Sequence, residues 1–179
     1  MSVRLAIIGD VHLHFNERDL SYFNRSDYDL ILFVGDLVNY APWRGKSVWP
    51  LIQRLEKTTL FMPGNHDAVR LMEPQLPLPD RVIKNFGDNL TFTANPVMLN
   101  LAGVQVLCYH GKSLDDLVSL REMSYEDPIN MMKELLNRRH LAPIYGAKTP
   151  LAPEKQDHLL IREIPDIFVT GHVLSLIHI

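Results

Sequence analysis

The sequence of 179 residues predicts a single α/β domain, and three observations support this fold class. Short apolar runs at residues 3–8, 29–34 and 58–62 predict buried strands. Residues 17–24 and 47–57, which lie between these runs, have the apolar spacing of helices. Each apolar run is followed by a Gly-Asp or a Pro-Gly-Asn sequence, which is typical of a sharp turn. This alternation favours a parallel sheet, in which ligands bind at the carboxyl ends of the strands.

The second half of the chain predicts further strands in a different arrangement. Residues 90–93, 97–101 and 104–109 have the composition of strands, and Ala102-Gly103 predicts a tight hairpin between the last two. Residues 167–170 predict a final strand that again ends in a glycine. Together these segments predict a second sheet, so we expect a sandwich of two sheets flanked by helices.

One longer helix is expected in the second half. Asp127 and Pro128 are typical of the N-cap and first position of a helix. Residues 141–156 hold three prolines and a glycine, so they predict a structured loop. The apolar face of the helix is predicted to consist of Ile129, Met132, Leu135 and Leu136.

Composition excludes several classes of protein. Hydrophobic residues make up 46% of the chain, which is too much for a disordered tail, and the formal charge of −3 gives no overall basic field. The longest apolar run, residues 30–34, is far too short to span a membrane. The single Cys108 excludes an internal disulfide and a thiolate zinc cluster, and residues 1–10 lack the apolar core of a signal peptide. We therefore expect a cytoplasmic protein with no membrane association.

Polar motifs follow five of the predicted strands. A single Gly-Asp or histidine at such a position is more often structural, but the ordered set predicts one shared site. Carboxylate, amide and imidazole groups are ligands suited to Mn²⁺, Fe or Zn²⁺, and one carboxylate, Asp36, could bridge two ions. The motifs are Asp10-Val11-His12, Gly35-Asp36, Gly64-Asn65-His66-Asp67, Tyr109-His110-Gly111 and Gly171-His172.

This series resembles the signature of the calcineurin-like metallophosphoesterase superfamily: D-x-H, G-D, G-N-H-[DE], H and G-H-x-H. The resemblance implies a four-layer α/β/β/α sandwich around two divalent metal ions, with Mn²⁺ expected and Fe or Zn²⁺ as alternatives. It assigns Asp10 and His12 to the first metal and makes Asp36 the bridge between both ions. The second metal would be bound by Asn65, His110 and His172.

The same resemblance implies a mechanism of phosphodiester hydrolysis. Two cations hold the phosphoryl group and activate a water molecule that attacks the phosphorus atom. His66 is expected to act as the acid, or as the group that stabilises the transition state, at the leaving oxygen. Asp67 is expected to orient His66.

One position departs from the superfamily pattern. Leu174 stands where G-H-x-H places the last ligand of the first metal. Residues 174–179 resemble a translated transposase adaptor, so we expect an incomplete, C-terminally truncated phosphoesterase domain at residues 1–173 and a non-native tail at 174–179. On this interpretation His178 is no substitute ligand, and the truncated chain, which lacks one ligand of its first metal, is expected to be weakly active or inactive. The alternative is a natural terminus with one ligand fewer at the first metal.

A narrower resemblance begins near residue 61 and continues to residue 173. Residues 63–70, 113–117 and 138–146 are similar to the small subunit of archaeal family-D DNA polymerase. That resemblance implies a Mn²⁺-dependent 3′–5′ exonuclease that acts on the 3′ ends of DNA beside a large polymerase subunit. Residues 1–60 resemble this family less, because their motif spacing is closer to compact stand-alone enzymes. Either the chain is a minimal relative, or two fragments are joined near residue 60.

A basic group follows the predicted helix at residues 138–140. Arg138, Arg139 and His140 are predicted to contact DNA or a partner protein. The alternative is a solvated helix end, where cations complement the helix dipole.

The sequence therefore leaves three functions open. The first is a dinuclear-metal phosphodiester hydrolase, expected to be the proofreading exonuclease subunit of a DNA polymerase. The second is a stand-alone phosphodiesterase or phosphatase that acts on a small phosphorylated substrate. The third is a catalytically inactive polymerase assembly subunit. The intact motif residues favour an enzyme, whereas Leu174 favours the inactive subunit; these intact residues are Asp10, His12, Asp36, Asn65, His66 and His110.

Overall fold

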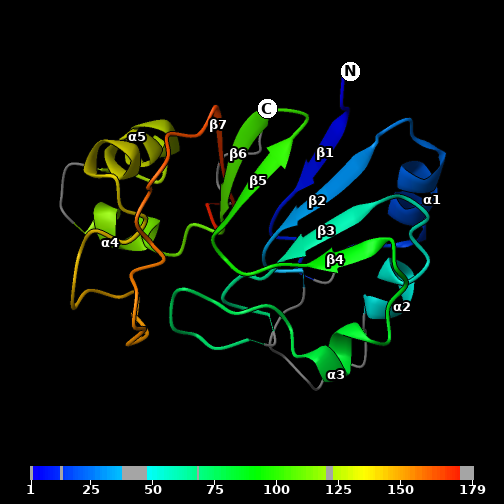
Figure 1. The fold of residues 1–179 in the computed structure, drawn as a ribbon, viewed down its shortest axis with the longest axis horizontal. Helices are drawn as coiled ribbons and strands as arrows, with labels where there is room; N and C mark the ends of the chain where they lie inside the picture. Colours follow the sequence, from blue (N-terminus) through cyan, green and yellow to red (C-terminus); the bar gives the residue numbers. More distant parts are fainter. Residues whose placement is uncertain (1, 13, 38–47, 68, 120–122, 174–179) are drawn as a thin grey trace.

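The computed structural model describes residues 2–12, 14–37, 48–67, 69–119 and 123–173, which include two β-sheets (Figure 1). Leu174 and the predicted tail at 174–179 lie outside the described residues.

The first sheet is parallel and brings three of the polar motifs to one edge. Ile8 lies beside Phe33, and Phe33 lies beside Phe61, so the first three strands end at nearly the same level. The segments that follow these strands therefore start side by side. The strands lie in the order β1 (Leu5–Ile8), β2 (Leu30–Val34), β3 (Thr59–Met62) and β4 (Leu90–Phe92).

The second sheet contains the other two motifs. Strands β5 (Val97–Leu101) and β6 (Val104–Tyr109) form an antiparallel hairpin, and β7 (Ile167–Thr170) lies parallel to β6. The predicted turn at Ala102-Gly103 is confirmed, with φ of 53° and 93°. Tyr109 lies beside Thr170, so His110 and Gly171 leave the sheet together.

Three apolar clusters separate the layers. The cluster between the sheets joins Leu32 and Met62 of the first sheet to Val106 and Cys108 of the second. The outer face of the first sheet packs against α1 (Glu17–Arg25), α2 (Trp49–Ile52) and α3 (Asp80–Ile83). The outer cluster of the second sheet includes α4 (Leu114–Val118) and α5 (Pro128–Arg138). The predicted α/β sandwich with four layers is thus confirmed.

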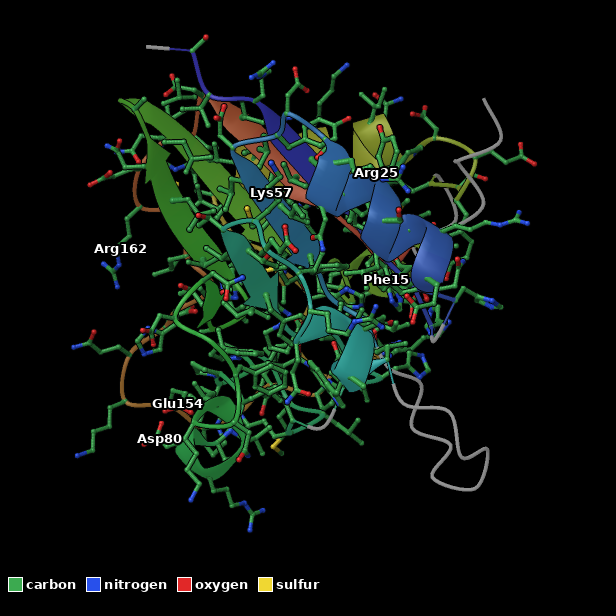
Figure 2. All side chains as sticks on the ribbon, turned by 90° about the vertical axis from the view of Figure 1, so that its right-hand side faces the viewer. Phe15, Arg25, Lys57, Asp80, Glu154 and Arg162 are labelled. Atoms are coloured by element: carbon green, nitrogen blue, oxygen red, sulfur yellow. The ribbon has the colours of Figure 1, made fainter. Side chains whose placement is uncertain are left out.

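Both outer helix layers are visible in the figures. Figure 1 shows α1 and α2 on one side of the sheets and α4 and α5 on the other. Figure 2 looks onto the side of the first sheet that α1 covers, with Phe15 just before the helix and Arg25 at its end. No helix in the described part of the chain is long and apolar enough to cross a bilayer.

The helix predicted at residues 47–57 is much shorter in the structure. Helix α2 covers only Trp49–Ile52, followed by turns up to Leu55. The backbone beyond it bonds to side chains of other elements: Glu56 N donates to Asn24, and the Asn89 amide donates to Leu55 and Lys57 carbonyls. These long-range partners replace the bonds of a longer helix.

The predicted face of α5 is wrong in one part. Its N-cap is confirmed, because the Asp127 carboxylate accepts from Asn130 N. However, Ile129 is 63% exposed, whereas Met131 and Leu135 are fully buried. The outer cluster of the second sheet contains Met131 and Leu135, with the partly buried Leu136 packed against it.

Candidate metal centre

The five motifs meet at the shared carboxyl ends of the strands, as the sequence predicts. Asp10 and His12 follow β1, Asp36 follows β2, and residues 65–67 follow β3. From the second sheet, His110 follows β6 and His172 follows β7. Four ligand atoms lie within 4.8 Å of one another: one oxygen each of Asp10 and Asp36, and one ring nitrogen each of His110 and His172. Both sheets thus contribute to one cluster of potential ligands.

The backbone at this cluster is unusually strained. Six non-glycine residues of the described chain have positive φ, and four of them belong to the motifs: Asp10 (53°), His12 (45°), Asp36 (54°) and His172 (67°). Residues other than glycine rarely adopt this conformation, and such strain concentrates at functional sites. The turns present these side chains to a common centre.

The ring of His110 faces two acceptor atoms, an arrangement that suits a cation. Its Nδ1 lies 3.2 Å from the Val34 carbonyl, which can only accept, so Nδ1 carries the hydrogen. Its Nε2 then directs a lone pair at Asn65 Oδ1, 3.0 Å away, and Asp36 Oδ2, 3.3 Å away. Three acceptor atoms that face one another are stabilised only by a proton or a metal ion between them.

The pKa shifts of the buried pair Asp36 and His110 also favour positive charge at this point. Burial lowers the pKa of His110, but the Asp36 carboxylate outweighs it, and the pKa of His110 lies above its ordinary value. Burial raises the pKa of Asp36, and the hydrogen bond and charge of His110 outweigh it, so the pKa of Asp36 is lowered. The residues therefore fit a divalent cation, because carboxylate, amide and imidazole donors converge where positive charge is favoured.

His12 supplies further donor atoms beside this pair. Its Nε2 lies 3.8 Å from Asp36 Oδ2 and 3.9 Å from Asp10 Oδ1. Its Nδ1 is buried and has no hydrogen-bond partner among the described residues. One nitrogen of the His12 ring thus lies near two carboxylates, and the other is buried without a partner, so the ring has donor capacity left for an ion.

His66 lies beside the cluster. Its backbone N donates to Asp36 Oδ1 at 2.8 Å, and its ring packs edge-on against the ring of His12, with 5.2 Å between the centroids. Burial is the main cause that lowers the pKa of His66 below its ordinary value. A neutral imidazole can still donate one N–H, so the position suits the predicted contact with a leaving oxygen.

Asp67 has a structural role that the sequence did not reveal. It is fully buried, and its Oδ2 accepts from Asp36 N at 2.9 Å and from Gly64 N at 2.8 Å. Asp67 therefore ties the turn after β2 to the turn after β3. The predicted role of Asp67 in orienting His66 stays a prediction.

The basic group after α5 makes contacts within the chain. Arg138 Nε donates to Glu134 at 2.5 Å, and Arg139 donates to the carbonyls of Ile161 and Arg162. His140 Nε2 lies 2.9 Å from Asp157 Oδ2. Arg139 and His140 thus bind residues 157–162 to the end of α5. Their predicted contact with DNA or a partner stays a prediction.

A buried carboxyl group that the sequence did not single out lies behind β6. Glu73 is 1% exposed, and its Oε2 accepts from Tyr109 Oη at 2.5 Å. The Tyr109 oxygen in turn accepts from Ser113 N at 3.1 Å. This chain of hydrogen bonds supports the residue directly before His110. Burial raises the pKa of Glu73 to about 7.

We expect Glu73→Gln to remove part of the pH dependence of stability. The pKa of Glu73 is about 7 in the folded state and 4.5 in the unfolded chain, so the folded state binds the proton more tightly. The protonated carboxyl group therefore stabilises the fold fully below pH 4.5, and this contribution is lost as the pH rises through 7. The difference corresponds to about 3 kcal/mol. Urea unfolding at pH 5, 6, 7 and 8 should show the wild type losing stability relative to Glu73→Gln. Parallel curves would contradict the assignment.

A known protein family matches most of the chain. The family model that describes the B subunit of DNA polymerases alpha and epsilon matches residues 48–176. This match includes every motif after Asp36.

Archaeal proteins called "DNA polymerase II small subunit" are also similar to the chain. The protein of Methanocaldococcus jannaschii is 51% identical over 189 aligned residues, which cover 92% of this chain and 30% of that protein. The proteins of Archaeoglobus fulgidus and Methanothermobacter thermautotrophicus are 49% and 47% identical, and each match covers 64% of this chain and 24% of the relative.

Two facts follow from these matches. The chain spans about a quarter to a third of the length of these relatives. The M. jannaschii match covers too much of the chain to begin at residue 61, so similarity extends into the segment for which the sequence predicted a poorer match. Because the family model covers more than two-thirds of its length, the chain belongs to the family of DNA polymerase alpha and epsilon B subunits.

Proposed function

We propose that this chain is the catalytic domain of a dinuclear-metal phosphodiester hydrolase. In its most specific form, the proposal is that the chain belongs to a Mn²⁺-dependent 3′–5′ DNA exonuclease subunit of a DNA polymerase. The observation that carries the proposal is that Asn65 Oδ1 and Asp36 Oδ2 lie 3.0 Å and 3.3 Å from Nε2 of the fully buried His110. Such a site accepts a cation, and the donor types suit Mn²⁺, with Fe or Zn²⁺ as alternatives.

The proposed ligands divide into two groups. Asp10 and His12 would hold the first ion, Asn65, His110 and His172 would hold the second, and Asp36 would serve both. When bound, the two ions stabilise the charge on a phosphoryl group and lower the pKa of a water molecule. The chain contributes the negative charge of Asp36, the position of which is fixed by His66 N and His110.

His66 is the proposed catalytic residue at the leaving group. Its ring lies beside His12 and outside the set of proposed ligands. With its pKa lowered by burial, the ring is largely neutral at pH 7 and donates an N–H to the leaving oxygen. Asp67 holds the loop that carries His66, because its carboxylate accepts from the backbone N–H groups of Asp36 and Gly64.

The family supports a role in DNA replication. The matched relatives are named as small subunits of DNA polymerase II, so we propose a large polymerase subunit and DNA 3′ ends as partners. This role implies a cytoplasmic protein.

A Mn²⁺-dependent exonuclease assay tests the proposal. The substrates are single-stranded DNA labelled at its 5′ end and bis(p-nitrophenyl) phosphate, each with and without Mn²⁺. We expect slow stepwise shortening of the DNA from its 3′ end, slow because Leu174 leaves the first metal one ligand short, and a rate about 10²–10⁴-fold lower still from a His66→Ala control. Hydrolysis of the aryl ester alone would instead support a stand-alone phosphodiesterase. Tight Mn²⁺ binding without hydrolysis of either substrate would support an inactive assembly subunit.

A further inference from the structure

A carboxylate from α4 contacts one of the proposed metal ligands. Asp115 Oδ2 lies 3.2 Å from His172 Nε2, and both side chains are mostly buried, with 15% and 13% exposed. No motif in the sequence indicates a role for residues 113–117 beyond their family resemblance. Asp115 is 57 positions away from His172, so the contact exists only because α4 packs beside the end of β7.

The other contacts of Asp115 define its role as an acceptor. Lys112 Nζ donates to Asp115 Oδ2 at 2.6 Å, and Tyr125 Oη donates to Oδ1 at 2.8 Å. A carboxylate held by an ammonium group and a phenol is ionised and can only accept from the third group. His172 Nε2 must therefore carry a hydrogen. Its Nδ1 is left with the lone pair that a metal ion needs.

The ring of His172 is held at two points. Its backbone N donates to Asp10 Oδ2 at 2.7 Å, which fixes the strained residue with φ of 67°. Its Nε2 contacts Asp115, which follows the fully buried Leu114 at the start of α4. The helix therefore presents the carboxylate from a packed position, which limits the rotation of the imidazole.

We infer that Asp115 is a positioning residue that fixes the orientation and tautomer of His172, so that its Nδ1 serves the second metal. This inference rests on the proposed metal centre and adds a residue outside its ligand set. Removal of a carboxylate that binds the second nitrogen of a ligating histidine typically weakens metal affinity about 10–100-fold.

Substitution of Asp115 with a matched control tests the inference. Asp157 forms a second aspartate–histidine pair of this kind, 2.9 Å from His140, and His140 is not in the ligand set. We expect Asp115→Asn to weaken Mn²⁺ binding about 10–100-fold in calorimetric titration, and Asp157→Asn to bind as the wild type does. The absorption spectrum of bound Co²⁺ should change only in Asp115→Asn, because it reports the ligands directly.

Two further measurements keep the test decisive. Tyr125→Phe removes only the hydroxyl that holds Asp115, so it should weaken Mn²⁺ binding less and in the same direction, even if Asp115→Asn does not fold. Nitrogen-15 NMR of the metal-free wild type should show the hydrogen of His172 on Nε2. A hydrogen on Nδ1, or equal affinity in wild type, Asp115→Asn and Tyr125→Phe, would overturn the inference. A wild type that binds no metal would instead overturn the proposed function.

Discussion

We expect His66→Ala to lower exonuclease turnover by about 10²–10⁴-fold, the usual contribution of a general acid, without removing bound metal. The contacts that attach His66 to the ligand cluster are its backbone N–H to Asp36 and its ring against His12. The substitution keeps the backbone bond and removes only the ring. Metal analysis by mass spectrometry together with the exonuclease rate checks both parts of this expectation.

Asp36→Asn should give the opposite pattern and serves as the comparison. The Asp36 carboxylate is 1% exposed and faces both His110 and His12, so its charge is shared by both halves of the site. Its loss should weaken binding of both ions together, by at least the ~10–100-fold seen when an outer partner of a ligand is removed. If His66→Ala empties the site, the roles assigned to these residues are wrong.

The position of the site could be predicted because it depends on strand ends alone. Each motif directly follows an apolar run, and parallel strands in register place such ends side by side. For this reason Asp10, Asp36 and the residues 65–67 meet in the structure as expected. His110 and His172 join them because β6 and β7 are also parallel and end together.

The supporting contacts could not be predicted, because they join residues that are distant in sequence and follow no local pattern. Asp67 binds the backbone of Asp36 across 31 positions, and Tyr109 binds Glu73 across 36 positions. Helices α3 and α4 have four and five residues, too few to show the apolar periodicity of a helix. The role of Asp115 depends on α4, so it was missed for the same reason.

Close packing of the backbone against the ligands leads to the second large effect. A methyl group added at Gly64 would lie 2.3 Å from Asp36 Oδ1, 2.6 Å from Asp36 N and 2.7 Å from His110 Cε1. None of these atoms can move freely, because Asp36 is held by His66 N and Asp67. The turn after β3 must therefore shift away from Asp36 and His110, two of the proposed ligands.

We expect Gly64→Ala to destabilise the fold by about 1–3 kcal/mol, as overpacking does, and to abolish tight Mn²⁺ binding. Gly9→Ala is the matched control, because Gly9 also precedes a ligand, yet an added methyl group would meet only Gly171 Cα at 3.7 Å and Val34 O at 4.0 Å. These are ordinary contacts, so Gly9→Ala should retain Mn²⁺ affinity and stability, or gain ~0.4–1 kcal/mol from the less flexible unfolded chain. Urea unfolding and Mn²⁺ titration of both variants provide the measurement. Equal behaviour of the two variants would show that the turn after β3 does not approach Asp36 as closely as the structure has it, and the proposed ligand geometry would fail with it.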